Sequence, residues 1–274
     1  MGQGVVMKLF DTHVHFPQAG DSPSVADWMR NAQAAGVVRC VAVGGSGRLN
    51  AAAEAAAAAY PEQVQLALGF DRDQAAADNA AIVAALSARL GAADASAVTV
   101  AAVGEIGMDL HYKPESSRWQ RDLFEAQLAL AREYTLPVIV HCREAEQAVL
   151  ECLQAHARLC SGRISGEPGV LHCFTGSAEF AHKLVDAGYM ISFSGIMTFK
   201  NAAALRETAR TLPLDRLVIE TDSPFLAPEP CRGRANEPAL VKHVAALLAD
   251  VRGRPLEELA GQLWSNACRL FGVL

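Results

Sequence analysis

Short apolar runs alternate with longer segments of helical periodicity along the whole chain. Each run is rich in Val, Ile or Leu and lacks polar alternation, which is typical of strands buried on both faces. Between the runs, segments such as Ser24–Ala35 and Ser116–Tyr134 place apolar side chains on one helical face; in the second, that face would include Trp119 and Leu123. The eight runs are Val5–Phe10, Val37–Val43, Val64–Leu68, Val98–Val103, Val138–Val140, Gly169–Leu171, Tyr189–Phe193 and Leu217–Ile219.

This repetition of strand and helix predicts one (β/α)8 barrel domain over residues 1–274, because no linker or change in composition divides the chain. The competing fold is a doubly wound open sheet, which would place a glycine-rich phosphate turn after the first strand. That place holds Asp11–His15, with the sequence Asp-Thr-His-Val-His and no glycine. We therefore favour the barrel.

Side chains able to bind metal follow five of the eight runs. His13 and His15 are two residues apart in an extended segment, so both side chains turn to the same side. In a (β/α)8 barrel, the carboxyl ends of all strands open on one face, where active sites are built. We therefore expect six ligands to converge there, namely His13, His15, Glu105, His141, His172 and Asp222. His156, His182 and His243 lie in expected helices, where packing or solvated roles are typical.

Four imidazoles and two carboxylates exceed what one tetrahedral zinc ion needs, and they suit two divalent cations that share a carboxylate. Two cations about 3.5–4 Å apart can hold a bridging hydroxide and stabilise both the attacking and the leaving oxygen of a hydrolysis. Imidazole suits zinc or manganese, and carboxylate suits magnesium or manganese, so Mg²⁺, Mn²⁺ and Zn²⁺ all stay open. The pattern predicts a metal-dependent hydrolase.

Composition restricts the class of protein further. With 51% hydrophobic and 20% charged residues, the chain is not of the disordered type. Its net charge of −6 is not that of a protein that coats nucleic acid, although a nuclease could concentrate basic groups at one site. Seven cysteines without a C-x-x-C pair, no signal-peptide pattern and no bilayer-length apolar run predict a cytoplasmic protein without membrane association. We expect a monomer without an obligate protein partner.

Six stretches of the sequence resemble the TatD family of metal-dependent deoxyribonucleases, a branch of the amidohydrolase-like barrels. The resemblance implies that His13, His15 and Asp222 hold a first metal and that Glu105 bridges to a second. His141 and His172 would complete the second site. Related phosphotriesterases use a carboxylated lysine as the bridge, so a glutamate there favours the TatD branch. The stretches run in order through nearly the whole chain: Phe10–His15, Val103–Asp109, Leu136–Arg143, His172–Ser177, Glu220–Pro224 and Arg232–Pro238.

Two acidic residues are expected to be catalytic. Glu105 would bridge the cations, and Asp222, at the end of the last strand, would accept the proton of the attacking water. We place Arg143, Arg232 and Asn236 at the substrate; all three lie in the matching stretches, and arginine pairs well with phosphate. Two further basic residues, Lys200 and Arg234, are equally well explained as solvated surface charges.

One stretch departs from the family pattern. Members commonly carry Gly-x-His-Pro at the end of the third strand, whereas this chain reads Gly69-Phe70-Asp71-Arg72. The histidine expected near the scissile phosphate is thus replaced by Asp71, or by Arg72 if the loop shifts. A carboxylate next to phosphate is repulsive, so we expect Asp71 to turn away, to pair with Arg72 or Arg143, or to be tolerated by a less charged substrate.

The leading functional hypothesis is a DNA phosphodiesterase that acts as a 3′→5′ exonuclease, as the resemblance implies. The alternative is a hydrolase of a small ester, lactone or amide on the same dinuclear site, which the acidic charge and the low aromatic content of 6% favour. A third reading is a binding protein on a barrel scaffold that has lost catalysis. The complete ligand set argues against this third reading.

Overall fold

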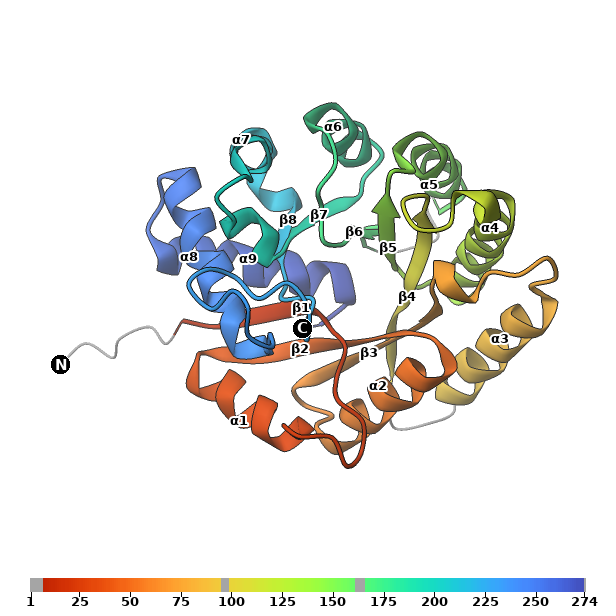
Figure 1. Ribbon diagram of the computed structural model, residues 1–274, viewed down its shortest axis with the longest axis horizontal. Helices are drawn as coiled ribbons and strands as arrows, with labels where there is room; N and C mark the ends of the chain where they lie inside the picture. The colour runs from red at the N-terminus through yellow and green to blue at the C-terminus, as the bar shows by residue number, and fades with distance from the viewer. Residues whose placement is uncertain (1–6, 95–98, 161–165, 274) are drawn as a thin grey trace.

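The computed structural model describes residues 7–94, 99–160 and 166–273. Eight parallel strands form one sheet in the order β1 to β8, each paired with its neighbour in sequence. Figure 1 shows the helices arranged around these strands, so the predicted (β/α)8 barrel is confirmed. The expected residues Val5, Val6 and Val98 lie outside the described ranges. The strands are β1 (Leu9–Val14), β2 (Val37–Gly45), β3 (Val64–Phe70), β4 (Val100–Asp109), β5 (Val138–Arg143), β6 (Gly169–Leu171), β7 (Met190–Phe193) and β8 (Leu217–Ile219).

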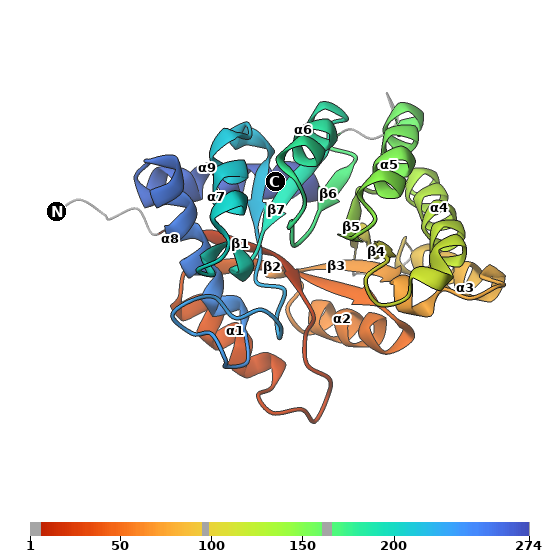
Figure 2. The same ribbon diagram turned by 45° about the horizontal axis from the view of Figure 1, so that its top comes forward.

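The helices cover the outer face of the barrel, and the view in Figure 2 shows the same ring from a second side. Local sequence sets their ends: Ser24 caps α1 in a reciprocal capping box with Asp27. None of the helices in the described ranges is both long and apolar enough to cross a lipid bilayer. The helices are α1 (Val25–Ala34), α2 (Gly47–Ala59), α3 (Ala80–Asp94), α4 (Ser117–Glu133), α5 (Glu146–Cys160), α6 (Ala178–Asp186), α7 (Ala203–Thr211), α8 (Val241–Arg252) and α9 (Leu256–Phe271).

Two apolar layers hold the barrel together. An inner cluster takes side chains from all eight strands, among them Phe10, Ile139 and Met190. Helix α9 closes the inner cluster, with the ring centroids of Phe10 and Phe271 5.8 Å apart. A larger outer cluster packs the strands against the surrounding helices. Because apolar side chains fill the interior, the polar groups are left at the strand ends.

Buried amides on α4 fix two strand ends at the mouth of the barrel. The Gln127 side chain accepts a hydrogen bond from the Phe70 N–H and donates one to the Phe70 carbonyl, both at 2.8 Å. Gln120 makes the same pair of contacts with Asp109, at 2.8 and 3.0 Å. The buried face of α4 is therefore rotated toward these glutamines. The prediction that Trp119 lies on that face is wrong, since Trp119 is 42% exposed.

The barrel closes between β1 and the segment after β8, next to the mouth. Val14 bridges to Ser223, and the Asp222 N–H donates to the His13 carbonyl at 3.1 Å. Asp11 accepts hydrogen bonds from the Thr221 N–H and hydroxyl at 2.9 and 2.6 Å. The β1–β2 register is irregular between Asp11 and Val14, and the Asp11 side chain contacts Thr221 whereas the His13 side chain contacts the cluster. Barrel closure therefore places the side chains that follow β8 next to those of β1.

Candidate metal centre

The six residues expected to converge lie together at the carboxyl ends of the strands. His13 and His15 come from the end of β1, Glu105 from β4 and His141 from β5, while His172 and Asp222 directly follow β6 and β8. Five of the six are buried, and the His141 side chain is 18% exposed. Their ring nitrogens and carboxylate oxygens meet around Glu105, whose two oxygens face different partners.

A local irregularity turns Glu105 into this cluster. The β4–β5 register shifts between Val103 and Ile106, and a Cβ atom at Gly104 would lie only 2.6 Å from the Ile139 Cβ. Only glycine fits at that approach, so β4 can press against β5 just before Glu105. The glycine that precedes the glutamate is therefore part of how the sequence positions the carboxylate.

Four donor atoms form one compact group on the β1 and β8 side, which we call group 1. The Nε2 atoms of His13 and His15 are 3.1 Å apart. The Glu105 Oε2 lies 3.8 and 3.4 Å from these two nitrogens. The Asp222 Oδ1 lies 3.8 and 3.9 Å from the same pair. Ligands about 2.1 Å from a tetrahedral ion are roughly 3.4 Å apart, so the two imidazole nitrogens and either carboxylate oxygen are spaced as ligands of one cation.

A second group forms on the β5 and β6 side, which we call group 2. The Glu105 Oε1 lies 3.1 Å from the His141 Nδ1 and 3.4 Å from the His172 Nε2. The His172 ring stacks on the His13 ring with centroids 4.0 Å apart, which brings the two groups side by side. Glu105 therefore offers one oxygen to each group.

Residues behind the cluster fix the histidine rings. The His15 Nδ1 lies 3.0 Å from the Val43 carbonyl oxygen. Asp109 Oδ2 is 3.2 Å from the His141 Nε2, and Glu220 Oε1 is 3.3 Å from the His172 Nδ1. Such partners orient metal-binding imidazoles and make them more basic. The sequence analysis did not predict that Asp109 and Glu220 orient the histidine rings. The one indication was that each lies in the same matching stretch as a predicted ligand.

Burial and neighbouring charge set the protonation of the cluster. Burial alone would raise the pKa of Glu105, but His172 and hydrogen bonds from His141 and His15 hold that pKa well below its usual range. Burial lowers the pKa of His13 well below its usual value. Burial also raises the pKa of Asp222 to about 6, partly offset by His172 and His15. Glu105 therefore stays ionised and His13 neutral near pH 7, which are the forms that bind a cation.

These residues fit divalent cations. Within the described residues, the buried His172 Nε2 and His13 Nδ1 have no hydrogen-bond partner. An unpaired buried donor or acceptor is costly, and the His172 Nε2 faces Glu105, where a cation would accept its lone pair. Neutral imidazole and carboxylate are ligands of Zn²⁺ and Mn²⁺, and carboxylate also suits Mg²⁺. The donor set could thus hold a divalent cation.

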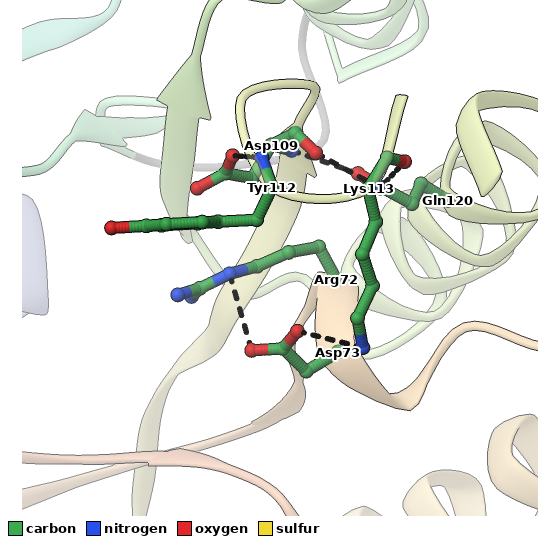
Figure 3. Close-up of a pocket in the computed structure, with 6 residues that line it drawn as sticks. All are labelled: Arg72, Asp73, Asp109, Tyr112, Lys113 and Gln120. Carbon is green, nitrogen blue, oxygen red and sulfur yellow. Dashed lines mark hydrogen bonds and ion pairs between the residues drawn. The ribbon is translucent and has the colours of Figure 1, made fainter. Parts of the chain in front are cut away.

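The departure after β3 places Arg72, not Asp71, beside the cluster. Asp71 caps the 3₁₀ turn Arg72–Gln74, its Oδ1 accepting from the Asp73 N–H at 2.8 Å. The Arg72 Nη1 donates to the Glu105 Oε1 at 2.8 Å. Figure 3 shows the Arg72 side chain between Tyr112 and Asp73, whose Oδ2 is 3.7 Å from the Arg72 Nε. The Asp71 carboxylate therefore caps this turn, and it still lies close enough to Glu105 for that charge to raise its pKa.

The three residues expected at the substrate differ in how free their side chains are to contact one. Arg143 lies at the end of β5, with its guanidinium 4.8 Å from the Tyr112 ring centroid and its Nη1 3.1 Å from the Tyr112 hydroxyl. Arg232 is exposed and stacks 3.9 Å from the Phe199 centroid. Asn236 is buried, and its Nδ2 donates to the carbonyls of Thr221 and Phe225, so its amide hydrogens hold the loop after β8. Lys200 and Arg234 are exposed on the surface.

Two exposed aromatic rings stand at the mouth, and the sequence reading did not find them. Tyr112, shortly after β4, is 66% exposed. Phe225, after β8, is 57% exposed, and its ring meets the His15 ring edge-on with centroids 6.3 Å apart. A low overall aromatic content gave no sign of these rings, because it does not say where the few aromatic residues lie.

Comparison with known proteins agrees with this geometry. YcfH of Escherichia coli K12, an uncharacterized metal-dependent hydrolase, is 47% identical over 174 residues, which cover 64% of this chain and 63% of YcfH, less than two thirds of its length. A 3′-5′ ssDNA/RNA exonuclease TatD of Pantoea ananatis is 36% identical over 180 residues, 64% of this chain and 67% of that protein. The crystal structure of the E. coli TatD homologue YjjV superposes with a TM-score of 0.87 and 31% identity, covering 98% and 100% of the two chains. The family model described as TatD related DNase matches residues 10–272, and the chain belongs to this family.

Proposed function

We propose that this protein is a metal-dependent 3′→5′ exonuclease that hydrolyses phosphodiester bonds of DNA. Groups 1 and 2 would each hold a divalent cation, with Glu105 shared between them. The observation that carries the proposal is the division of the Glu105 carboxylate, with Oε2 3.4 Å from the His15 Nε2 and Oε1 3.1 Å from the His141 Nδ1. The exonuclease name of the Pantoea relative supports the choice of substrate.

Asp222 is the proposed general base. Divalent cations, when bound here, would supply an activated water and stabilise negative charge on the phosphate. Asp222 lies between the two histidines of group 1, and its backbone N–H is tied to the His13 carbonyl. Its backbone has a φ of 59°, a conformation rare for residues other than glycine and frequent at functional sites. With its pKa raised to about 6 by burial, the Asp222 carboxylate can accept a proton near neutral pH.

The rim of the mouth supplies what a nucleotide would contact. Arg143 offers a cation for a phosphate, and the exposed rings of Tyr112 and Phe225 offer faces on which bases can stack. A small ester would need neither exposed ring. The rim therefore favours a nucleic-acid strand over the small-ester alternative.

The test is a nuclease assay on a 25-mer single-stranded DNA that carries a label at either end. The purified protein is incubated with Mg²⁺, Mn²⁺ or Zn²⁺ and with EDTA as a control. We expect stepwise shortening of the 5′-labelled strand and early release of a 3′ label, both abolished by EDTA. A panel of aryl esters is assayed in parallel. Robust ester hydrolysis with negligible DNA cleavage would reject the nuclease in favour of the small-ester hydrolase.

A further inference from the structure

The guanidinium of Arg72 stands where group 2 would bind its cation. Three nitrogens surround the Glu105 Oε1: the Arg72 Nη1 at 2.8 Å, the His141 Nδ1 at 3.1 Å and the His172 Nε2 at 3.4 Å. Two of these nitrogens are the proposed group 2 ligands. The third is a permanent positive charge that already uses one lone pair of the shared oxygen.

Arg72 is held in this position by the fold around it. Gln127 fixes the Phe70 backbone from both sides, and the Asp71 cap shapes the turn in which Arg72 lies. The Arg72 side chain is only 22% exposed, and Asp73 pairs with its Nε. The neighbouring Asp73 also binds the Lys113 ammonium at 3.2 Å, which ties the turn to the loop after β4 (Figure 3). The fold therefore holds the guanidinium in a fixed position at the mouth of the barrel.

Group 1 does not share this neighbour. In the part of the chain that the structure describes, the ion pairs of Arg72 are with Glu105 Oε1 and with Asp73. The two carboxylate oxygens of group 1 lie 3.4 to 3.9 Å from its two imidazole nitrogens, which are 3.1 Å apart. A cation in group 1 would thus meet two carboxylates, whereas a cation in group 2 would meet a guanidinium a few ångströms away.

We propose that Arg72 is a built-in cation that weakens the second metal position and leaves the protein with one tight and one weak divalent-cation site. The inference rests on the proposed metal centre. A divalent cation and a guanidinium on the same carboxylate oxygen repel each other, and even in a water-like dielectric this repulsion weakens binding at least about tenfold. At low metal concentration, the positive charge beside the Glu105 Oε1 is then the guanidinium itself.

The experiment is a calorimetric titration of metal-free protein with Mn²⁺ and, separately, Zn²⁺. For the wild type we expect one tight site and a second at least about tenfold weaker. Arg72→Met should strengthen the second site at least about tenfold, with little change in the first. Arg72→Gln, which stays polar, serves as a second neutral variant in case Arg72→Met unfolds, and a thermal melt checks both.

A matched control is available in Arg89→Met. Arg89 pairs with Glu54 at 2.7 Å and its side chain is 31% exposed. The substitution therefore removes a similar ion pair between two outer helices, away from the mouth. The Arg89 variant should keep the wild-type difference between the two sites. Two equally tight sites in the wild type would overturn the role of Arg72, as would a second site that gains no affinity in either neutral variant. Absence of any bound cation in the wild type would instead reject the metal centre of the proposed function.

Discussion

The two halves of the centre, groups 1 and 2, both take their side chains from strand ends, but the charges around them differ. Group 1 lies where β1 and β8 close the barrel, and its carboxylates belong to Glu105 and Asp222. Group 2 lies over β5 and β6, where Glu105 Oε1 is shared with Arg72. Both halves take their candidate ligands from strand ends, but the Arg72 ion pair from the turn after β3 is made with group 2.

The halves also differ in what supports them. Backbone bonds of barrel closure hold group 1, such as the Asp222 N–H to the His13 carbonyl. Side-chain carboxylates hold group 2, with Asp109 behind His141 and Glu220 behind His172. The difference teaches that strand ends bring the candidate ligands together, while loops and outer partners set the charges around each half.

The largest effect is expected from Glu105→Gln, which removes the charge that both halves share. We expect kcat to fall at least about 10²-fold and both cations to bind more weakly, because the preorganised anion at the centre is lost. Steady-state kinetics and metal titration measure these changes. An unaltered far-ultraviolet dichroism spectrum would show that the fold is kept. A variant within threefold of the wild-type kcat would mean that Glu105 is not shared.

Asp222→Asn should separate the halves. We expect kcat to fall about 10²-fold because the proposed base is removed, and the group 1 cation to bind more weakly because it loses one carboxylate. Group 2 lies on the other side of Glu105, so its affinity should change much less. Titration with Mn²⁺ shows which site is altered. Equal weakening of both sites would contradict the division of the centre into two halves.

Much of the fold and of the ligand set could be predicted from sequence because both follow from local patterns. Each buried strand was visible as an apolar run, and the polar residue that followed it marked the mouth, as with His141 after Val138–Val140. Motif resemblance then ordered the same residues around Glu105. The six side chains do gather in the structure, but their roles as ligands stay a prediction.

What could not be predicted depends on contacts between distant segments. That Arg72 reaches Glu105, 33 positions away, follows from the cap by Asp71 and the hold of Gln127 on Phe70. The burial of Asn236 was hidden for the same reason, since its partners are carbonyls of the β8 loop. Trp119 was misplaced because two glutamines, rather than apolar side chains alone, set the inner face of α4.

The outer carboxylates allow a finer test of group 2. Glu220→Gln would remove the anion next to the His172 Nδ1, and Asp109→Asn the anion next to the His141 Nε2. Loss of such a partner typically weakens metal binding about tenfold to 10²-fold. We expect both variants to weaken the group 2 site by about tenfold and to leave group 1 within about threefold. A titration in which group 1 weakens more than group 2 would show that the outer carboxylates serve the whole centre.

The smallest effect concerns Asp71, the acidic residue next to Arg72. Burial raises the pKa of Asp71, Glu105 raises it further, and Arg72 partly offsets both. A carboxyl whose pKa is raised in the folded state binds a proton more readily there than in the unfolded chain, so its ionised form disfavours folding at pH 7. This cost disappears as the pH falls through the folded-state pKa.

Asp71→Asn keeps an acceptor for the Asp73 N–H and removes the charge, so metal-free protein should gain about 1 kcal/mol in unfolding free energy at pH 7. Urea unfolding with EDTA present, repeated at a series of lower pH values, should show that gain shrinking toward zero. A gain that stays constant with pH would mean that the amide stabilises the turn itself and that Asp71 carries no electrostatic strain beside group 2.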